Sequence, residues 1–167
     1  MPTVDDHYIV DIEGSGFGGR SYPIEVGVAM PDGGKYCSLV RPPTQWTHWD
    51  DSAEQVHHIS RDTLHSHGRP VVEVAGELNE RFAGETLYSD GWVVDKPWLI
   101  TLFFAACIDM EFRVSPLEMI LSEPQMAIWH ETKDHISVNS DSPRHRASHD
   151  AWVIQETYKQ TLDIVAS

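Results

Sequence analysis

The amino-acid sequence predicts an α/β sandwich built around a mixed β-sheet. Three strand-like segments follow one another over residues 8–41, and the rest of the chain alternates between helical and strand-like segments in the order β-β-β-α-β-α-(β or α)-α. The chain has 167 residues, which is the usual size of one domain and enough to bury a core of its own. We therefore expect a single domain over residues 1–167.

The first three strands are expected at residues 8–13, 22–30 and 35–41. The first (YIVDIE) places carboxylates among β-branched and apolar residues and ends at Gly14, as a central strand does. The second and third are separated by residues 31–34 (PDGG), which form a strong hairpin signal. The chain is therefore expected to open with an antiparallel meander.

The middle of the chain predicts two helices separated by a strand. Apolar residues recur at helical spacing over residues 71–82. A strand is expected at residues 86–93, followed by an apolar-rich helix over residues 95–107 with Pro97 in its first turn, where a missing N–H is harmless. Upstream of these elements, Ser52 is expected to cap a short helix.

The last third of the chain is less regular. Residues 112–121 fit a short strand or a helix equally well. Residues 123–143 have a mixed polar composition with two prolines, and we expect them to form a mobile connector. Residues 145–163 place apolar side chains on one stripe, which predicts a final helix.

The composition argues against several classes of protein. Lys and Arg total 12 against 26 Asp and Glu, so the formal charge is −14. This charge argues against a basic face for duplex DNA, but not against short or metal-bridged nucleic acid. The longest apolar run, residues 98–108, is too short to span a bilayer, and no secretion signal is expected. Only Cys37 and Cys107 are present, which favours reduced thiols and a cytoplasmic location.

A glycine motif after the first strand has the wrong context. Gly14, Gly16 and Gly19 spell G-x-G-x-x-G, as in dinucleotide-binding proteins. That motif must open a helix whose N-terminus holds the pyrophosphate, whereas here Pro23 and a strand-like segment follow. We therefore reject the dinucleotide interpretation.

Two histidine patterns are also rejected as zinc sites. His130-Glu131 and His135 are one residue too long for H-E-x-x-H, so the two imidazoles would lie on different faces of a helix. His145 and His149 are four residues apart, but the chain has ten histidines, and we interpret this pair as part of a solvated helix face.

Asp11 and Glu13 are the first candidates for chemistry. Two positions apart on a strand, their carboxylates point to the same side, and like charges that close are unfavourable unless a positive group lies between them. A divalent cation would meet that need. An ion pair with Arg20 or the capping of a turn would also account for them, and these alternatives stay open on the two residues alone.

Two more acids and a histidine favour the metal. Asp95 stands where a strand is expected to end and a helix to begin, a position at which a carboxylate also caps helices. Asp150 follows His145 by five residues in the predicted last helix. Together with Asp11 and Glu13, these residues would form a two-metal site with a general base.

Four stretches of the chain, taken in order, carry a family resemblance: Asp11-Ile12-Glu13 with Gly16 and residues 24–28 (IEVGV), residues 56–60 (VHHIS), residues 87–99 with Asp95, and residues 145–151 (HRASHDA). In that order, the four stretches resemble four features of the DEDDh 3′→5′ exonucleases. These are the first motif, the V-H-G-I-[ST] stretch, the second motif, and the third motif, H-R-A-x-x-D-A. That family includes proofreading subunits, oligoribonuclease and RNase T. The resemblance implies a ribonuclease H-like fold with a mixed central sheet (β-β-β-α-β-α-β-α) and helices on both faces.

The resemblance also implies a reaction. Asp11, Glu13, Asp95 and Asp150 would hold two Mg²⁺ or Mn²⁺ ions, which suit hard oxygen ligands, and His145 would be the general base. The implied activity is 3′→5′ hydrolysis of single-stranded nucleic acid to nucleoside 5′-monophosphates, with RNA favoured over DNA and short oligonucleotides among the substrates. A homodimer is expected by analogy with RNase T and oligoribonuclease.

Three residues are expected to contact the 3′ end of the substrate. Gly16 and Phe17 follow the first motif, where the family places an apolar wedge against the terminal base; burial of Phe17 in the core is the alternative. His57 is expected to touch the terminal nucleotide, or else to be structural. Ser89-Asp90 stands where the family commonly has His-Asn, and the alternative to an enzyme is a catalytically inert nucleic-acid- or nucleotide-binding module.

Overall fold

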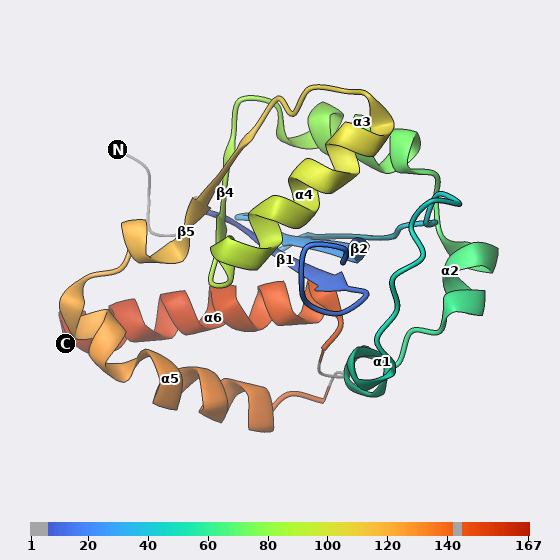
Figure 1. The fold of residues 1–167 in the computed structure, drawn as a ribbon. Helices are drawn as coiled ribbons and strands as arrows, with labels where there is room; N and C mark the ends of the chain where they lie inside the picture. Colours follow the sequence, from blue (N-terminus) through green and yellow to red (C-terminus); the bar gives the residue numbers. More distant parts are fainter. Residues whose placement is uncertain (1–6, 142–144) are drawn as a thin grey trace.

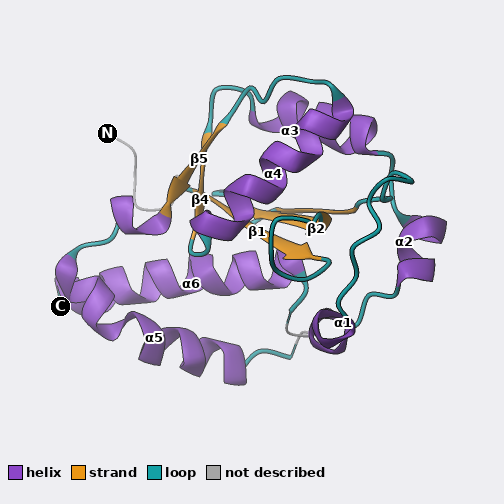
Figure 2. Ribbon diagram, in the orientation of Figure 1, coloured by secondary structure: helices purple, strands orange, loops and turns teal. Residues whose placement is uncertain are grey.

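The computed structural model describes residues 7–141 and 145–167, and its centre is a five-stranded sheet (Figure 2). The strands are β1 (Tyr8–Gly14), β2 (Pro23–Ala29), β3 (Lys35–Leu39), β4 (Thr86–Ser89) and β5 (Arg113–Pro116). In the order β3-β2-β1-β4-β5, β1 pairs antiparallel with β2 and parallel with β4. The sheet is therefore mixed, as predicted, and the chain opens with the predicted meander.

Helices cover both faces of the sheet. The described residues form α1 (Asp51–His57), α2 (Arg61–His67), α3 (Val71–Phe82), α4 (Trp92–Ala106), α5 (Glu123–Val138) and α6 (Ala147–Ala166). In Figure 1, α3 and α4 lie on one side of the sheet, and α6 lies on the other with α5 alongside it. None of these helices has the length and hydrophobicity needed to cross a membrane.

The alternation of side chains along β1 decides where the acids lie. Val10 and Ile12 are buried in the apolar cluster that α3 and α4 cover, whereas Ile9 belongs to the cluster under α6. Because successive side chains of a strand point to opposite faces, Asp11 and Glu13 lie on the same face as Ile9. Both acids therefore face α6, the helix that carries Asp150.

The last helix lies directly on the sheet. Ala147 and Ala151 are fully buried, and a Cβ added at Gly27 in β2 would lie only 2.2 Å from the backbone nitrogen of Ser148. Glycine at position 27 therefore allows α6 to approach β2 at backbone contact. The helix begins at Ala147 and not at His145, so the predicted start is two residues too early.

The boundary between β4 and α4 also differs from the sequence prediction. β4 ends at Ser89 instead of residue 93, and α4 begins at Trp92 instead of residue 95. The first residues of the helix (WVV) have the composition of a strand, and packing of the helix against the sheet overrides that preference. Pro97 is consequently the sixth residue of α4 and lies beyond its first turn.

The predicted connector at residues 123–143 is largely a helix. α5 begins after Ser122, whose hydroxyl accepts the N–H of Gln125 while the Gln125 side chain accepts the N–H of Ser122. This capping box is a helix-start signal that composition alone does not reveal. Residues 142–144 of the predicted connector lie outside the described residues.

Three shorter segments complete the comparison. Residues 112–121 contain β5 followed by a 3₁₀ helix, Leu117–Met119, so neither single interpretation holds for the whole stretch. The N-cap of α1 is Asp50, whose carboxylate accepts the N–H of Ser52, so Ser52 is not the cap. α2, with Ser60 at its N-cap, has no counterpart in the sequence prediction.

Candidate active site

Three carboxylates meet where β1 faces the start of α6. Asp11 and Glu13 belong to β1, and Asp150 lies in the first turn of α6. One oxygen atom from each residue lies within 4.8 Å of the other two. This spacing places three hard oxygen donors within reach of one divalent cation.

Asp95 lies beside this cluster but is not one of the three residues whose oxygens all lie within 4.8 Å of one another. It is buried in the first turn of α4, and its Oδ2 accepts a hydrogen bond of 2.6 Å from the hydroxyl of Ser89. The N–H of Ile12 in β1 also donates to its carboxylate. Asp95 is thus anchored to the strand that carries the first two acids, and it makes the largest charge contribution to the pKa of Asp11.

Burial and repulsion between acids raise the pKa of Asp11, Glu13 and Asp95. Burial, followed by the charge of Asp150, raises the pKa of Glu13 to about 9. Burial raises the pKa of Asp95 to about 7, and it raises the pKa of Asp11 well above its usual range. Arg20 is exposed, and among the described residues no Lys or Arg forms an ion pair with any of these acids. A set of oxygen donors without a basic partner fits a divalent cation.

His145 stands at the edge of the cluster, immediately before α6. Its backbone is left-handed, with φ of 62°, and its N–H donates to Oδ1 of Asp150 at 3.2 Å. The residue is exposed and lines a pocket of about 170 Å³ together with Asp11, Asp90, Lys133 and Asp150. An imidazole in that position can exchange a proton with water in the pocket.

The Ser89-Asp90 pair makes two different contacts in the site. Ser89 donates to Asp95, as described above, whereas Asp90 forms an ion pair with Lys133 of α5, with 2.6 Å between Oδ2 and Nζ. Lys133 therefore brings a positive charge to the wall of the same pocket. Lys133 was not among the predicted site residues, because residues 123–143 were expected to form a connector.

A second pocket, of about 290 Å³, brings the three predicted substrate contacts together. Glu13, Gly16, Phe17, His57 and Trp98 are among the residues that line it. Phe17 is 77% exposed and stacks on Trp98 with 6.4 Å between the ring centroids, so the alternative of a core position is wrong. An exposed aromatic surface of this kind is one on which a nucleobase can stack.

His57 is a buried residue in the wall of this second pocket. Its Nδ1 accepts the N–H of Ile59 at 3.0 Å, which assigns the ring proton to Nε2. Burial lowers the pKa of His57, which favours the neutral form of the ring. Its Nε2 is buried and has no hydrogen-bond partner within residues 7–141 and 145–167. His57 therefore offers one N–H donor that the rest of the described protein does not use.

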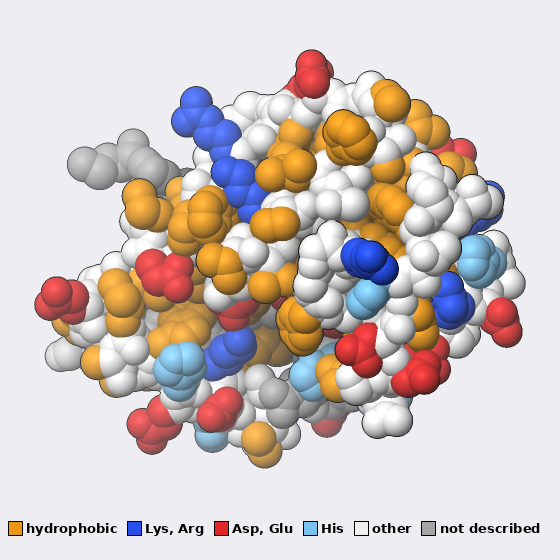
Figure 3. Space-filling model, viewed as in Figure 1, with side chains coloured by type: hydrophobic (Ala, Val, Ile, Leu, Met, Phe, Trp, Pro, Cys, Tyr) orange, Lys and Arg blue, Asp and Glu red, His pale blue; other side chains and the backbone are white. Residues whose placement is uncertain are grey.

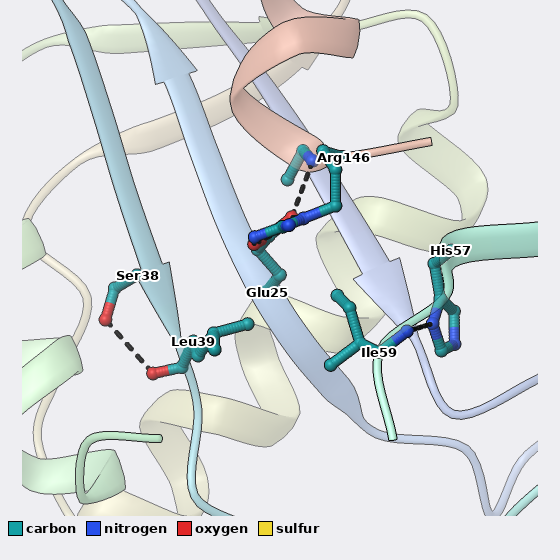
Figure 4. A network of polar contacts seen from close by, with 7 residues as sticks. Glu25, Ser38, Leu39, His57, Ile59 and Arg146 are labelled. Carbon is teal, nitrogen blue, oxygen red and sulfur yellow. Dashed lines mark hydrogen bonds and ion pairs between the residues drawn. The ribbon is translucent and has the colours of Figure 1, made fainter. Parts of the chain in front are cut away.

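An ion pair between Glu25 and Arg146 connects β2 to the start of α6 (Figure 4). Glu25 is fully buried, and its carboxylate accepts from Nε and Nη2 of Arg146 and from the N–H of Ala147. The two charged residues lie inside stretches that the sequence analysis compared with known motifs, IEVGV and HRASHDA. Their pairing could not be read from those motifs, because it depends on how the helix lies on the sheet.

The rejected glycine and histidine patterns do not form the structures that their motifs require. After Gly14 the chain forms a loop and then β2, so the G-x-G-x-x-G stretch opens no helix. His130 and His135 are exposed on α5. His149 is buried in α6 and stacks on Trp152, so the interpretation of a solvated face is wrong for it.

Comparison with known proteins identifies the fold. No protein-family model matches the chain, and no curated protein matches it in sequence. The zinc-bound E. coli exonuclease I–ssDNA complex matches with a TM-score of 0.72 and 12% identity, covering 95% of this chain and 42% of that chain. This match shows that the chain has the same mixed α/β fold as that protein. E. coli exonuclease I with a dT13 oligonucleotide matches with a TM-score of 0.71 and 12% identity, covering 93% and 40%.

The chain spans about two fifths of the length of these exonuclease I chains, 42% and 40% in the two comparisons. The predicted ribonuclease H-like architecture, with a mixed sheet and helices on both faces, is confirmed. The narrower resemblance to RNase T and oligoribonuclease remains a prediction from the motifs.

Proposed function

We propose that the protein is a divalent-metal-dependent 3′→5′ exonuclease that degrades single-stranded nucleic acid to nucleoside 5′-monophosphates, with RNA favoured over DNA. The observation that carries this proposal is the carboxylate cluster of Asp11, Glu13 and Asp150, whose oxygens lie within 4.8 Å of one another beside the pocket of His145. The exonuclease fold supports the same class of reaction.

The four acids are the proposed ligands. Asp11, Glu13, Asp95 and Asp150 would hold two Mg²⁺ or Mn²⁺ ions, because carboxylate oxygens suit these hard cations. Bound there, the ions would supply Lewis acidity to the phosphate and stabilise the oxygens that attack and leave in an in-line displacement. The protein contributes rigidity, since β1 carries two of the acids while α4 and α6 carry one each.

His145 is the proposed general base. Its imidazole ring would accept the proton of the attacking water and then release it to solvent. Because the residue is exposed, its ring can release the proton directly to solvent. The hydrogen bond from its N–H to Asp150 ties the base to one of the proposed metal ligands.

The second pocket is the proposed site for the 3′-terminal nucleotide. Its base would stack on Phe17 and Trp98, and Nε2 of His57 would donate to an oxygen of the sugar or the base. We favour RNA because the compact single domain resembles the RNA-processing members of the family. The similar solved structures include complexes of exonuclease I with single-stranded DNA, so both substrates enter the test.

The test is to incubate the protein with a 5′-labelled single-stranded RNA and the matched DNA in Mg²⁺, Mn²⁺ or EDTA. We expect a ladder that shortens from the 3′ end when metal is present and is lost in EDTA. Asp11→Ala should remove the ladder, and Asp163→Ala, at an exposed acid far along α6, should keep it. Absence of cleavage of both substrates by folded, metal-loaded protein would favour the inert binding module.

We also propose a homodimer formed through the outer face of α4. Val93, Ile100 and Phe104 on this face are 76%, 50% and 85% exposed. Figure 3 shows hydrophobic side chains gathered over the surface where α4 lies in Figure 1. With a charge of −14 per chain, a face without acidic side chains minimises repulsion between two copies, and the exposed residues of α4 include no acid. Sedimentation should show a dimer that Phe104→Asp dissociates; a wild-type monomer at all concentrations would contradict this.

A further inference from the structure

The ion pair of Glu25 and Arg146 has no direct part in the proposed reaction, yet it holds the start of α6, which carries Asp150 and directly follows His145 and Arg146. We propose that Glu25 and Arg146 are positioning residues, whose contact sets the place of His145 and Asp150 relative to the acids of β1. This inference rests on the proposed function.

The geometry of the pair leaves little freedom. Nε of Arg146 lies 3.0 and 3.1 Å from the two carboxylate oxygens of Glu25, and its Nη2 lies 2.6 Å from Oε2. A planar guanidinium that is held through two nitrogens cannot rotate without breaking a contact. Oε1 of Glu25 also accepts the N–H of Ala147 at 2.8 Å, so the same carboxylate holds the first residue of α6.

A second contact fixes the same helix end. Gly27 lies two residues beyond Glu25 on β2, and a Cβ added there would lie 2.2 Å from the nitrogen of Ser148 and 2.3 Å from the carbonyl carbon of Ala147. The start of α6 thus packs against β2 at Gly27 and is hydrogen-bonded to β2 at Glu25. The helix end therefore cannot slide along the strand without losing both contacts.

His145 needs such support because of its backbone conformation. Its φ of 62° is disfavoured for a residue with a side chain, and such a conformation persists where the surrounding structure imposes it. Arg146 is the next residue, and its anchored side chain holds one side of the peptide. The hydrogen bond from His145 N–H to Asp150 holds the other side. Loss of the ion pair would therefore let the imidazole move relative to the carboxylates.

A purely stabilising role does not explain a charged pair at this place. Glu25 is the direct cross-strand neighbour of Glu13, so it adds another negative charge beside a cluster that already repels itself. In protein interiors, apolar residues of similar volume often replace an ion pair without loss of stability. What apolar residues cannot supply is the combination of a bidentate contact and a backbone acceptor at the start of α6.

The experiment separates positioning from stability with a double variant. In Glu25→Gln/Arg146→Met, the glutamine oxygen still accepts the N–H of Ala147, and no charge is left unpaired in the interior. Arg146→Lys keeps the charge without the bidentate contact. Glu77→Gln, which removes a different Arg–Glu pair between Arg69 and α3, is the matched control. For each protein we would measure Tm, Mn²⁺ affinity, and kcat and KM at saturating Mn²⁺.

We expect the double variant to keep its Tm and Mn²⁺ affinity close to wild type while kcat falls about 10- to 100-fold, with KM changed less than about threefold. The kcat of Arg146→Lys should lie between those of wild type and the double variant, and the kcat of Glu77→Gln should match wild type. A kcat of the double variant within about threefold of wild type would overturn the positioning role and leave the proposed function standing. A loss of kcat no larger than the loss of folded protein would do the same. An inactive wild-type protein would overturn the proposed function and this inference with it.

Discussion

Replacing Glu13 by glutamine is expected to stabilise the metal-free protein at neutral pH. Burial and the charge of Asp150 raise the pKa of Glu13 from 4.5 to about 9 in the folded state. Between those two values the folded protein holds a proton that the unfolded chain has released. Because the folded state binds more protons in that window, its stability falls as the pH rises from 4.5 toward 9.

The size of this effect follows from the interval between the unfolded pKa and the working pH. At about 1.4 kcal/mol per pH unit, the interval from 4.5 to pH 7 corresponds to about 3.5 kcal/mol lost by the folded wild-type protein. Glutamine has the same shape and donates a hydrogen bond to Asp150, as the protonated carboxyl group does. For a chain of this length, Glu13→Gln should raise Tm by about 7–14 °C in EDTA.

The assay is thermal unfolding by circular dichroism in EDTA between about pH 5 and 8. The gain in Tm should be small at the acidic end and should grow with pH. Glu80→Gln, at an exposed position of α3, is the control and should show no such trend. Added Mn²⁺ should raise the Tm of wild type far more than that of Glu13→Gln. A variant that is no more stable than wild type at pH 7, or a gain that does not change with pH, would refute the reasoning.

Three further variants test other parts of the site. His145→Ala should lower the rate by about 10²- to 10⁴-fold with Mn²⁺ affinity kept, and near wild-type turnover would remove it as the base. Phe17→Ala should weaken substrate binding by about 1–3 kcal/mol without changing Tm, because the ring is 77% exposed; a clear loss of Tm would show a core role instead. Gly27→Ala should destabilise the protein by about 1–3 kcal/mol, measured by urea unfolding, because the new Cβ meets the backbone of α6; an unchanged midpoint would argue against that contact.

The acids of the site could be predicted from the sequence because their signal is local. Asp11 and Glu13 are two positions apart on a strand whose alternation is clear, so their shared face follows from period two alone. The start of β4 and the whole of α3 were also recognisable from periodicity. The third motif located Asp150, and the structure brings it to the first two acids.

The contacts that arrange the site could not be predicted, because they depend on tertiary packing. Lys133 reaches Asp90 only because residues 123–138 form a helix, and the capping box of Ser122 and Gln125 is a weak signal within a polar stretch. Glu25 and Arg146 are far apart in the sequence, and nothing local shows that the helix start lies on β2. The β4–α4 boundary was misplaced because the WVV sequence suits both a strand and a helix.

The most direct test of the account follows the two ends of one RNA strand in Mn²⁺, with wild type and Asp150→Asn. We expect wild type to release a 3′-terminal label as a nucleoside 5′-monophosphate from the first turnover, while a 5′ label yields a descending ladder. Asp150→Asn should do neither, because it removes one ligand of the carboxylate cluster. Internal cleavage that leaves the 3′ label on an oligonucleotide, or equal release by Asp150→Asn, would contradict the central claim.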